Sequence, residues 1–149
     1  MSDGNTRTTS GSETYHHILL VEDNPGDVGL IRRALAHQEP HTQLHVACDG
    51  LQALDFLRQC GRGDAPPHPD LILVDLNLPK MDGCELLEHI RQNMRLLSIP
   101  VVVLSSSQAE ADVVRSYAHQ ANCYITKPLD LEEYLAVIKA VHHFWLMVA

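Results

Sequence analysis

The chain has 149 residues, a formal net charge of −8 and only 11 lysine and arginine residues. One domain of this length can bury a substantial core, and the acidic balance argues against a surface that binds a nucleic-acid backbone. The polar residues 1–14 contain no apolar stretch and no segment reaches the roughly 20 apolar residues that span a bilayer, so we expect a disordered lead-in over 1–14 and one soluble, cytoplasmic domain over 15–149.

The order of apolar runs and turn residues predicts five strands, each followed by a helix. The strands are expected at 17–22, 43–47, 71–75, 100–104 and 123–126. Asn24 and Pro25 suit the N-cap and first position of the first helix, and Ser107 begins a capping box for the fourth. Asp130 suits the N-cap of the last helix.

This alternation predicts an α/β domain, a doubly wound (βα)5 fold around a five-stranded parallel sheet. Parallel strands connected by helices are covered on both faces, which explains why the strands are apolar throughout instead of alternating. Ligands of such sheets bind at the carboxyl ends of the strands, where the strand order reverses. The polar side chains expected there are Glu22, Asp23, Asp75, Ser105 and Lys127.

These side chains together indicate a site for phosphoryl transfer. Three converging acids repel one another, and a divalent cation such as Mg²⁺ keeps such a cluster ionised while accepting phosphate oxygens. Lys127 adds a positive charge and Ser105 a hydroxyl donor, which leaves Asp75 free to act as the nucleophile. Asp75 by itself would suit a turn cap and Lys127 a solvated surface residue; their combination favours the site.

Four separated segments carry a resemblance to a known family. "LLVEDNPGD", "LILVDLNLPKMDG", "IPVVVLSSS" and "CYITKPL" resemble the motifs of response-regulator receiver domains, whose fold is CheY-like and flavodoxin-like, over about residues 16 to 142. The resemblance implies that Asp75 accepts a phosphoryl group from a phosphohistidine of a sensor histidine kinase.

The same resemblance implies roles for the neighbouring residues. Asp23, Asp75 and the main-chain carbonyl of Asn77 would bind Mg²⁺ directly, and Glu22 would act through a coordinated water. Lys127 would pair with the phosphoryl group. Ser105 and Tyr124 would form the switch, Ser105 closing on the phosphoryl group and Tyr124 turning inward.

The chain departs from the family pattern at two positions. Glu22 replaces the more usual aspartate and keeps its charge. Ser105 replaces the more frequent threonine, which keeps the hydroxyl and removes a methyl group that restricts its rotamer. The start "VEDNPGD", the proline-rich loop before the third strand, "NCYITKPLDLEEY" and the terminal "FWL" further resemble single-domain regulators that are paired with bacterial phytochrome kinases.

The end of the chain, "HHFWLMVA", is apolar nearly all round a helix. Such an extension of the last helix predicts a partner surface or homodimer interface, made by Tyr134, Ile138, Phe144 and Trp145. The alternative is a helix end that packs against its own domain. The adjacent histidines at 16–17 and 142–143 are expected to be solvated or partly packed, because neighbours on a strand or helix point to different faces.

Several functions fit such a site. A phosphorylation switch would signal to an unknown downstream protein through a changed surface, or act as a phosphorelay intermediate or phosphate sink. A Mg²⁺-dependent aspartyl-phosphate hydrolase would need an acid two residues after Asp75, where Asn77 cannot donate and recover a proton. A flavodoxin-like cofactor carrier would bring an anionic cofactor against three acids without a glycine-rich cradle.

Overall fold

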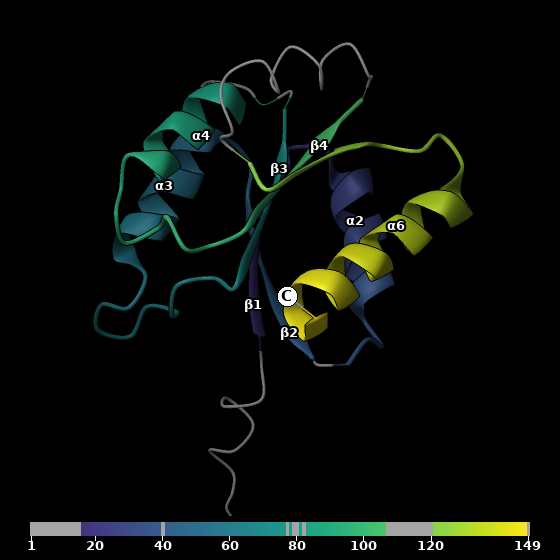
Figure 1. Ribbon diagram of the computed structural model, residues 1–149, viewed down its shortest axis with the longest axis horizontal. Coiled ribbons are helices and arrows are strands. Elements are labelled where there is room, and N and C mark those ends of the chain that lie inside the picture. The colour runs from purple at the N-terminus through teal and green to yellow at the C-terminus, as the bar shows by residue number, and fades with distance from the viewer. Residues whose placement is uncertain are drawn as a thin grey trace, which may run out of the picture.

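The computed structural model describes residues 16–39, 41–76, 78, 81, 83–106 and 121–148 (Figure 1). They form one parallel sheet in the order β2-β1-β3-β4-β5. Its strands are β1 (His16–Val21), β2 (Thr42–Ala47), β3 (Leu71–Asp75), β4 (Val101–Ser105) and β5 (Cys123–Thr126). The predicted doubly wound sheet is therefore confirmed, and predicted strand ends differ from these by at most one residue.

Helices cover both faces of the sheet. In Figure 1, α2 (Pro25–Leu35) and α6 (Leu131–His143) lie on one side, and α3 (Gly50–Gln59) and α4 (Gly83–Arg91) on the other. A π-helical turn, η1 (Phe144–Val148), continues α6. The predicted lead-in and the helix predicted to begin at Ser107 lie outside the described residues. In the part of the chain that the structure describes, no helix is both long and apolar enough to cross a membrane.

Capping side chains begin the helices where the sequence predicts. The Asn24 side chain accepts hydrogen bonds from the backbone N–H groups of Gly26 and Asp27, at 2.8 and 3.1 Å, and Pro25 opens α2. The Asp130 carboxylate accepts the N–H of Glu133 at 2.9 Å and begins α6. Each cap satisfies backbone donors that have no partner inside the helix.

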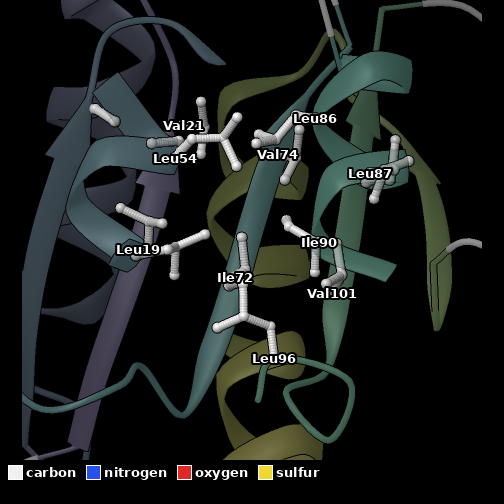
Figure 2. Close-up of a cluster of buried hydrophobic side chains, with 14 of the residues drawn as sticks. Leu19, Val21, Leu54, Ile72, Val74, Leu86, Leu87, Ile90, Leu96 and Val101 are labelled. Atoms are coloured by element: carbon white, nitrogen blue, oxygen red, sulfur yellow. The ribbon is translucent and has the colours of Figure 1, made fainter. Parts of the chain in front are cut away.

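The apolar core has two layers, one on each face of the sheet. The layer under α3 and α4 joins alternate residues of the strands to the inner side of both helices (Figure 2); its labelled members are Leu19, Val21, Leu54, Ile72, Val74, Leu86, Leu87, Ile90, Leu96 and Val101. The second layer, which faces α2 and α6, contains the strand residues Ile18, Leu20, Leu71, Leu73, Val102 and Leu104. Burying one such side chain contributes about 1.5–3 kcal/mol, so both layers together fix the sheet and its polar edge.

The structure corrects part of the predicted partner surface. Tyr134 and Ile138 are only 5% and 2% exposed because their side of α6 packs on the sheet, so neither is available to a partner. Trp145 is half-buried against the same core layer. Phe144 and Met147 are 49% and 54% exposed, so the exposed apolar residues at this end of the chain lie in η1.

Candidate functional site

The strand order reverses between β1 and β3, and this places their carboxyl ends side by side. Val21 and Val74 are partners in the sheet, so Glu22 and Asp75 each follow directly. The N–H of Glu22 donates to the Ala47 carbonyl at 2.9 Å, which continues the ladder toward β2. The two carboxylates are thus held at the edge of the sheet by the backbone on which they stand.

Three carboxylates meet at this edge. Glu22, Asp23 and Asp75 each offer an oxygen within 4.8 Å of the others. Glu22 and Asp75 are buried, at 1% and 5% exposure, while Asp23 is exposed. An all-oxygen set of carboxylates suits a hard divalent cation and leaves room for water or phosphate oxygens. This part of the predicted metal set is brought together; Asn77 lies outside the described residues.

Burial and mutual repulsion disfavour the ionised forms of the clustered acids. Burial, followed by the charge of Asp75 and a hydrogen bond with it, raises the pKa of Glu22 to about 7, although Lys127 acts in the opposite direction. The ionised pair is therefore unfavourable unless a further positive charge lies nearby. The cluster has the electrostatic character of a cation site.

Lys127 reaches the acids from the end of β5, an edge strand of the sheet. It follows β5, and its N–H donates to the Ser105 carbonyl at 2.7 Å, which fixes its backbone beside β4. Its Nζ lies 2.9 Å from Asp27 Oδ2, 3.1 Å from Glu22 Oε1 and 3.6 Å from Asp75 Oδ2. Burial lowers the pKa of Lys127, but the three acids raise it by more than burial lowers it. The net pKa is above the ordinary value for lysine, so the ammonium is fully charged at neutral pH.

The predicted switch residues occupy β4 and β5. Ser105 is the last residue of β4, is fully buried and pairs with Thr126. Tyr124 is half-buried beside the core layer of α3 and α4, and its hydroxyl accepts the N–H of Ala121 at 3.2 Å. Tyr124 lies on β5, the strand that leads to Lys127, and Ser105 lies beside Lys127, whose N–H donates to its carbonyl. Their switching roles stay predictions.

A glycine allows the start of α4 to lie close to the backbone of Asp75 and Leu76. A Cβ at Gly83 would lie 3.0 Å from Leu76 Cα and 3.1 Å from the Asp75 carbonyl oxygen. The N–H of Gly83 also donates to the Leu76 carbonyl at 3.3 Å. The start of α4 therefore approaches the backbone of Asp75 as closely as a residue without a side chain permits.

Sequence reasoning missed one acid of the site. Asp27 stands in the first turn of α2, where an acidic residue is ordinarily interpreted as a partner of the helix dipole. Its carboxylate instead lies 2.9 Å from the Lys127 ammonium, nearer than Glu22 or Asp75, across 100 residues of sequence. The only available signal was the motif "VEDNPGD" itself, which ends at this residue.

Comparisons with known proteins agree on one family. A family model described as the response regulator receiver domain matches residues 18–139. The chain is 45% identical over 129 residues to the response regulator Rcp1 of Synechocystis, an alignment that covers 87% of this chain and 88% of the relative.

Solved structures give the same result. The structure of the phosphorylated cyanobacterial phytochrome response regulator RcpA has a TM-score of 0.82 and 44% identity, covering 91% of this chain and 96% of that chain. The Mn²⁺-bound form of Rcp1 has a TM-score of 0.80 and 43% identity, covering 90% and 96%. The relatives thus include a phosphorylated protein and one that holds a divalent metal.

Proposed function

This chain belongs to the family of response regulator receiver domains, and we propose that it is a single-domain signalling switch that is phosphorylated on Asp75. The observation that carries the proposal is the position of Asp75: a buried carboxylate at a strand end, clustered with Glu22 and Asp23 and 3.6 Å from the Lys127 ammonium. A carboxylate so placed has an oxygen that can attack and the Lys127 ammonium to stabilise the incoming charge, and the neighbouring acids could hold a divalent cation for the same purpose.

The proposed reaction is transfer from a phosphohistidine. An oxygen of Asp75 attacks phosphorus, the P–N bond breaks as the O–P bond forms, and the imidazole leaves with the electron pair and takes up a proton. Lys127 stabilises the phosphoryl oxygens, and Ser105 donates its hydroxyl to one of them. A bound Mg²⁺ would supply positive charge that offsets the repulsion of these acids for the incoming phosphoryl group.

The metal ligands are proposed residue by residue. Asp23, Asp75 and the main-chain carbonyl of Asn77 would hold Mg²⁺ directly, and Glu22 would do so through water. The oxygen donors of Glu22, Asp23 and Asp75 fit either Mg²⁺ or Mn²⁺. The Mn²⁺-bound relative supports a divalent ion in this class of protein.

We propose a sensor histidine kinase of the phytochrome class as the partner, acting in the cytoplasm. The support is the likeness to proteins described as phytochrome response regulators. The output would be a surface change in which Ser105 and Tyr124 take part, read by a downstream protein, or onward transfer of the phosphoryl group. Catalytic turnover of external phosphate esters is disfavoured because Asn77 stands where a hydrolase needs its general acid.

Intact-protein mass after incubation with Mg²⁺ and a small phosphoramidate tests the proposal. We expect one added phosphoryl group that is released by hydroxylamine and is lost in Asp75→Asn. Asp49→Asn is the matched control: Asp49 is also a buried aspartate at the carboxyl edge of the sheet, but it caps α3, a role that asparagine fills equally well. No adduct on the native chain, even with candidate kinases supplied, would refute the proposal.

We further propose that the exposed apolar part of η1 forms a homodimer interface. Phe144 and Met147 are about half exposed, and Phe144 packs edge-on against Trp145 at a ring separation of 4.9 Å. Exposed apolar side chains of this size favour association. Replacing Phe144 and Met147 by Ser should convert a dimeric mass in sedimentation analysis to a monomeric one; Met94→Ser, at 86% exposure elsewhere, is the control. A native chain that sediments as a monomer would reject the interface.

A further inference from the structure

The resting position of Lys127 is set mainly by an acid outside the predicted site. An ammonium has three N–H donors. In Lys127 one is directed to Asp27 at 2.9 Å and a second to Glu22 at 3.1 Å, whereas Asp75 lies at 3.6 Å, beyond a good hydrogen bond. The lysine is therefore drawn away from the residue whose phosphoryl group it is expected to meet.

Its two hydrogen-bonded partners differ in how readily they can release it. The side chain of Glu22 is 1% exposed, and its other oxygen accepts the N–H of Asn24 at 3.2 Å. The Asp27 side chain is 26% exposed and stands on the first turn of α2. Water can replace Lys127 at Asp27 but not at Glu22, so the contact with Asp27 is the one that breaks at lower cost.

A buried hydroxyl lies near the contact between Asp27 and Lys127. Asp27, Lys127 and Tyr134 line a common cavity of about 310 Å³ between α2 and the start of α6. The Tyr134 hydroxyl is buried and has no hydrogen-bond partner within the described residues. A buried hydroxyl without a partner is costly, and a nearby carboxylate that loses its cation is a suitable acceptor.

We propose that Asp27 is a positioning residue that exchanges its partner on phosphorylation. In the resting protein it holds Lys127; in the phosphorylated protein Lys127 moves to a phosphoryl oxygen and the freed Asp27 accepts the Tyr134 hydroxyl. This inference rests on the proposed phosphorylation of Asp75. The exchange would change the contacts between α2 and α6 on phosphorylation, independently of Ser105 and Tyr124.

Lysine-selective ¹⁵N spectra test the exchange directly, with beryllium fluoride and Mg²⁺ as a stable mimic of the phosphoryl group. The chain has only three lysines, and the signal lost in Lys127→Arg assigns the ammonium of Lys127. In Asp27→Asn the resting signal should differ from that of the native chain, whereas the two signals in the mimic-bound state should coincide. If the bound-state signals differ as much as the resting ones, Asp27 keeps its contact and the exchange is refuted.

Affinity for the mimic, measured by ¹⁹F NMR, separates exchange from simple charge removal. Asp27→Asn should bind it about three- to tenfold more tightly, because a competing partner of Lys127 is weakened. Glu132→Gln removes an exposed negative charge from the first turn of α6 and should change the affinity much less. In a Lys127→Met background, which removes the cation that pairs with Asp27, the gain from Asp27→Asn should shrink. A gain of equal size would mean that Asp27 acts only through its charge and would overturn the inference.

The role of Tyr134 has its own variant. Tyr134→Phe removes only the hydroxyl, and we expect it to weaken mimic binding by about threefold, because the freed Asp27 loses its new donor. Unchanged affinity would remove Tyr134 from the exchange. Failure of the native chain to bind the mimic at all would instead refute the proposed phosphorylation and the exchange with it, whereas normal binding without these variant effects would refute the exchange alone.

Discussion

Glu22 offers a sharp test of the electrostatics at the edge of the sheet. Its pKa rises from 4.5 to about 7 on folding, first through burial and then through Asp75. Between pH 4.5 and about 7, Glu22 has released its proton in the unfolded chain and has kept it in the folded chain. Stability that is fully present below pH 4.5 is therefore lost as the pH rises toward 7, and the loss is complete above it.

The size of the effect follows from the same shift. A change from 4.5 to about 7 corresponds to about 3 kcal/mol, and relaxation of the neighbouring acids reduces this, so we expect about 1–3 kcal/mol. Glu22→Gln keeps the shape and removes the ionisation. In the presence of a chelator, the variant should be more stable than the native chain by this amount at pH 8 and about equally stable at pH 4.

Urea unfolding at the two pH values measures this difference. Glu88→Gln, an exposed acid on α4, is the control and should change stability by less than about 0.5 kcal/mol at either pH. Added Mg²⁺ should stabilise the native chain more than the Glu22→Gln variant, because the variant has lost one charge of the cluster. A variant that is less stable than the native chain at pH 8 without metal would show that Lys127 dominates Glu22, and the reasoning would be wrong.

Three further outcomes test the fold around the site. Gly83→Ala places a methyl group 3.0 Å from Leu76 Cα, so it should destabilise the protein by about 1–3 kcal/mol and slow phosphorylation, measured by thermal unfolding and intact mass; unchanged values would contradict the close approach. Ile72→Ala empties a fully buried position and should cost about 2–5 kcal/mol in urea unfolding, against about 0.5–1.5 for Ile72→Val. Burial and then the charge of His17 lower the pKa of His45 below 6.5, so the stability that is present above pH 6.5 is lost as the pH falls. His45→Gln should make this loss of unfolding free energy less steep between pH 7 and 5. An equally steep loss in the variant would refute the role of His45.

The sequence predicts much of the candidate site because its signals are local. Apolar strands that end in Glu22 and in Asp75 are visible as short runs, and the parallel-sheet rules bring such ends to one edge. The caps at Asn24 and Asp130 are predictable for the same reason, because each bonds within three residues of itself. These inferences need no knowledge of how distant segments pack.

The amino-acid sequence alone predicts the class of fold, the strand ends to within one residue and the three acids that meet at the edge of the sheet. The contact between Asp27 and Lys127 could not be predicted, because an ion pair depends on a separation of a few ångströms between segments 100 residues apart. Only the tertiary structure shows that Tyr134 and Ile138 are internal. Helical periodicity identifies residues that share a face, but whether that face meets a sheet, a partner or water depends on the packing of the whole domain.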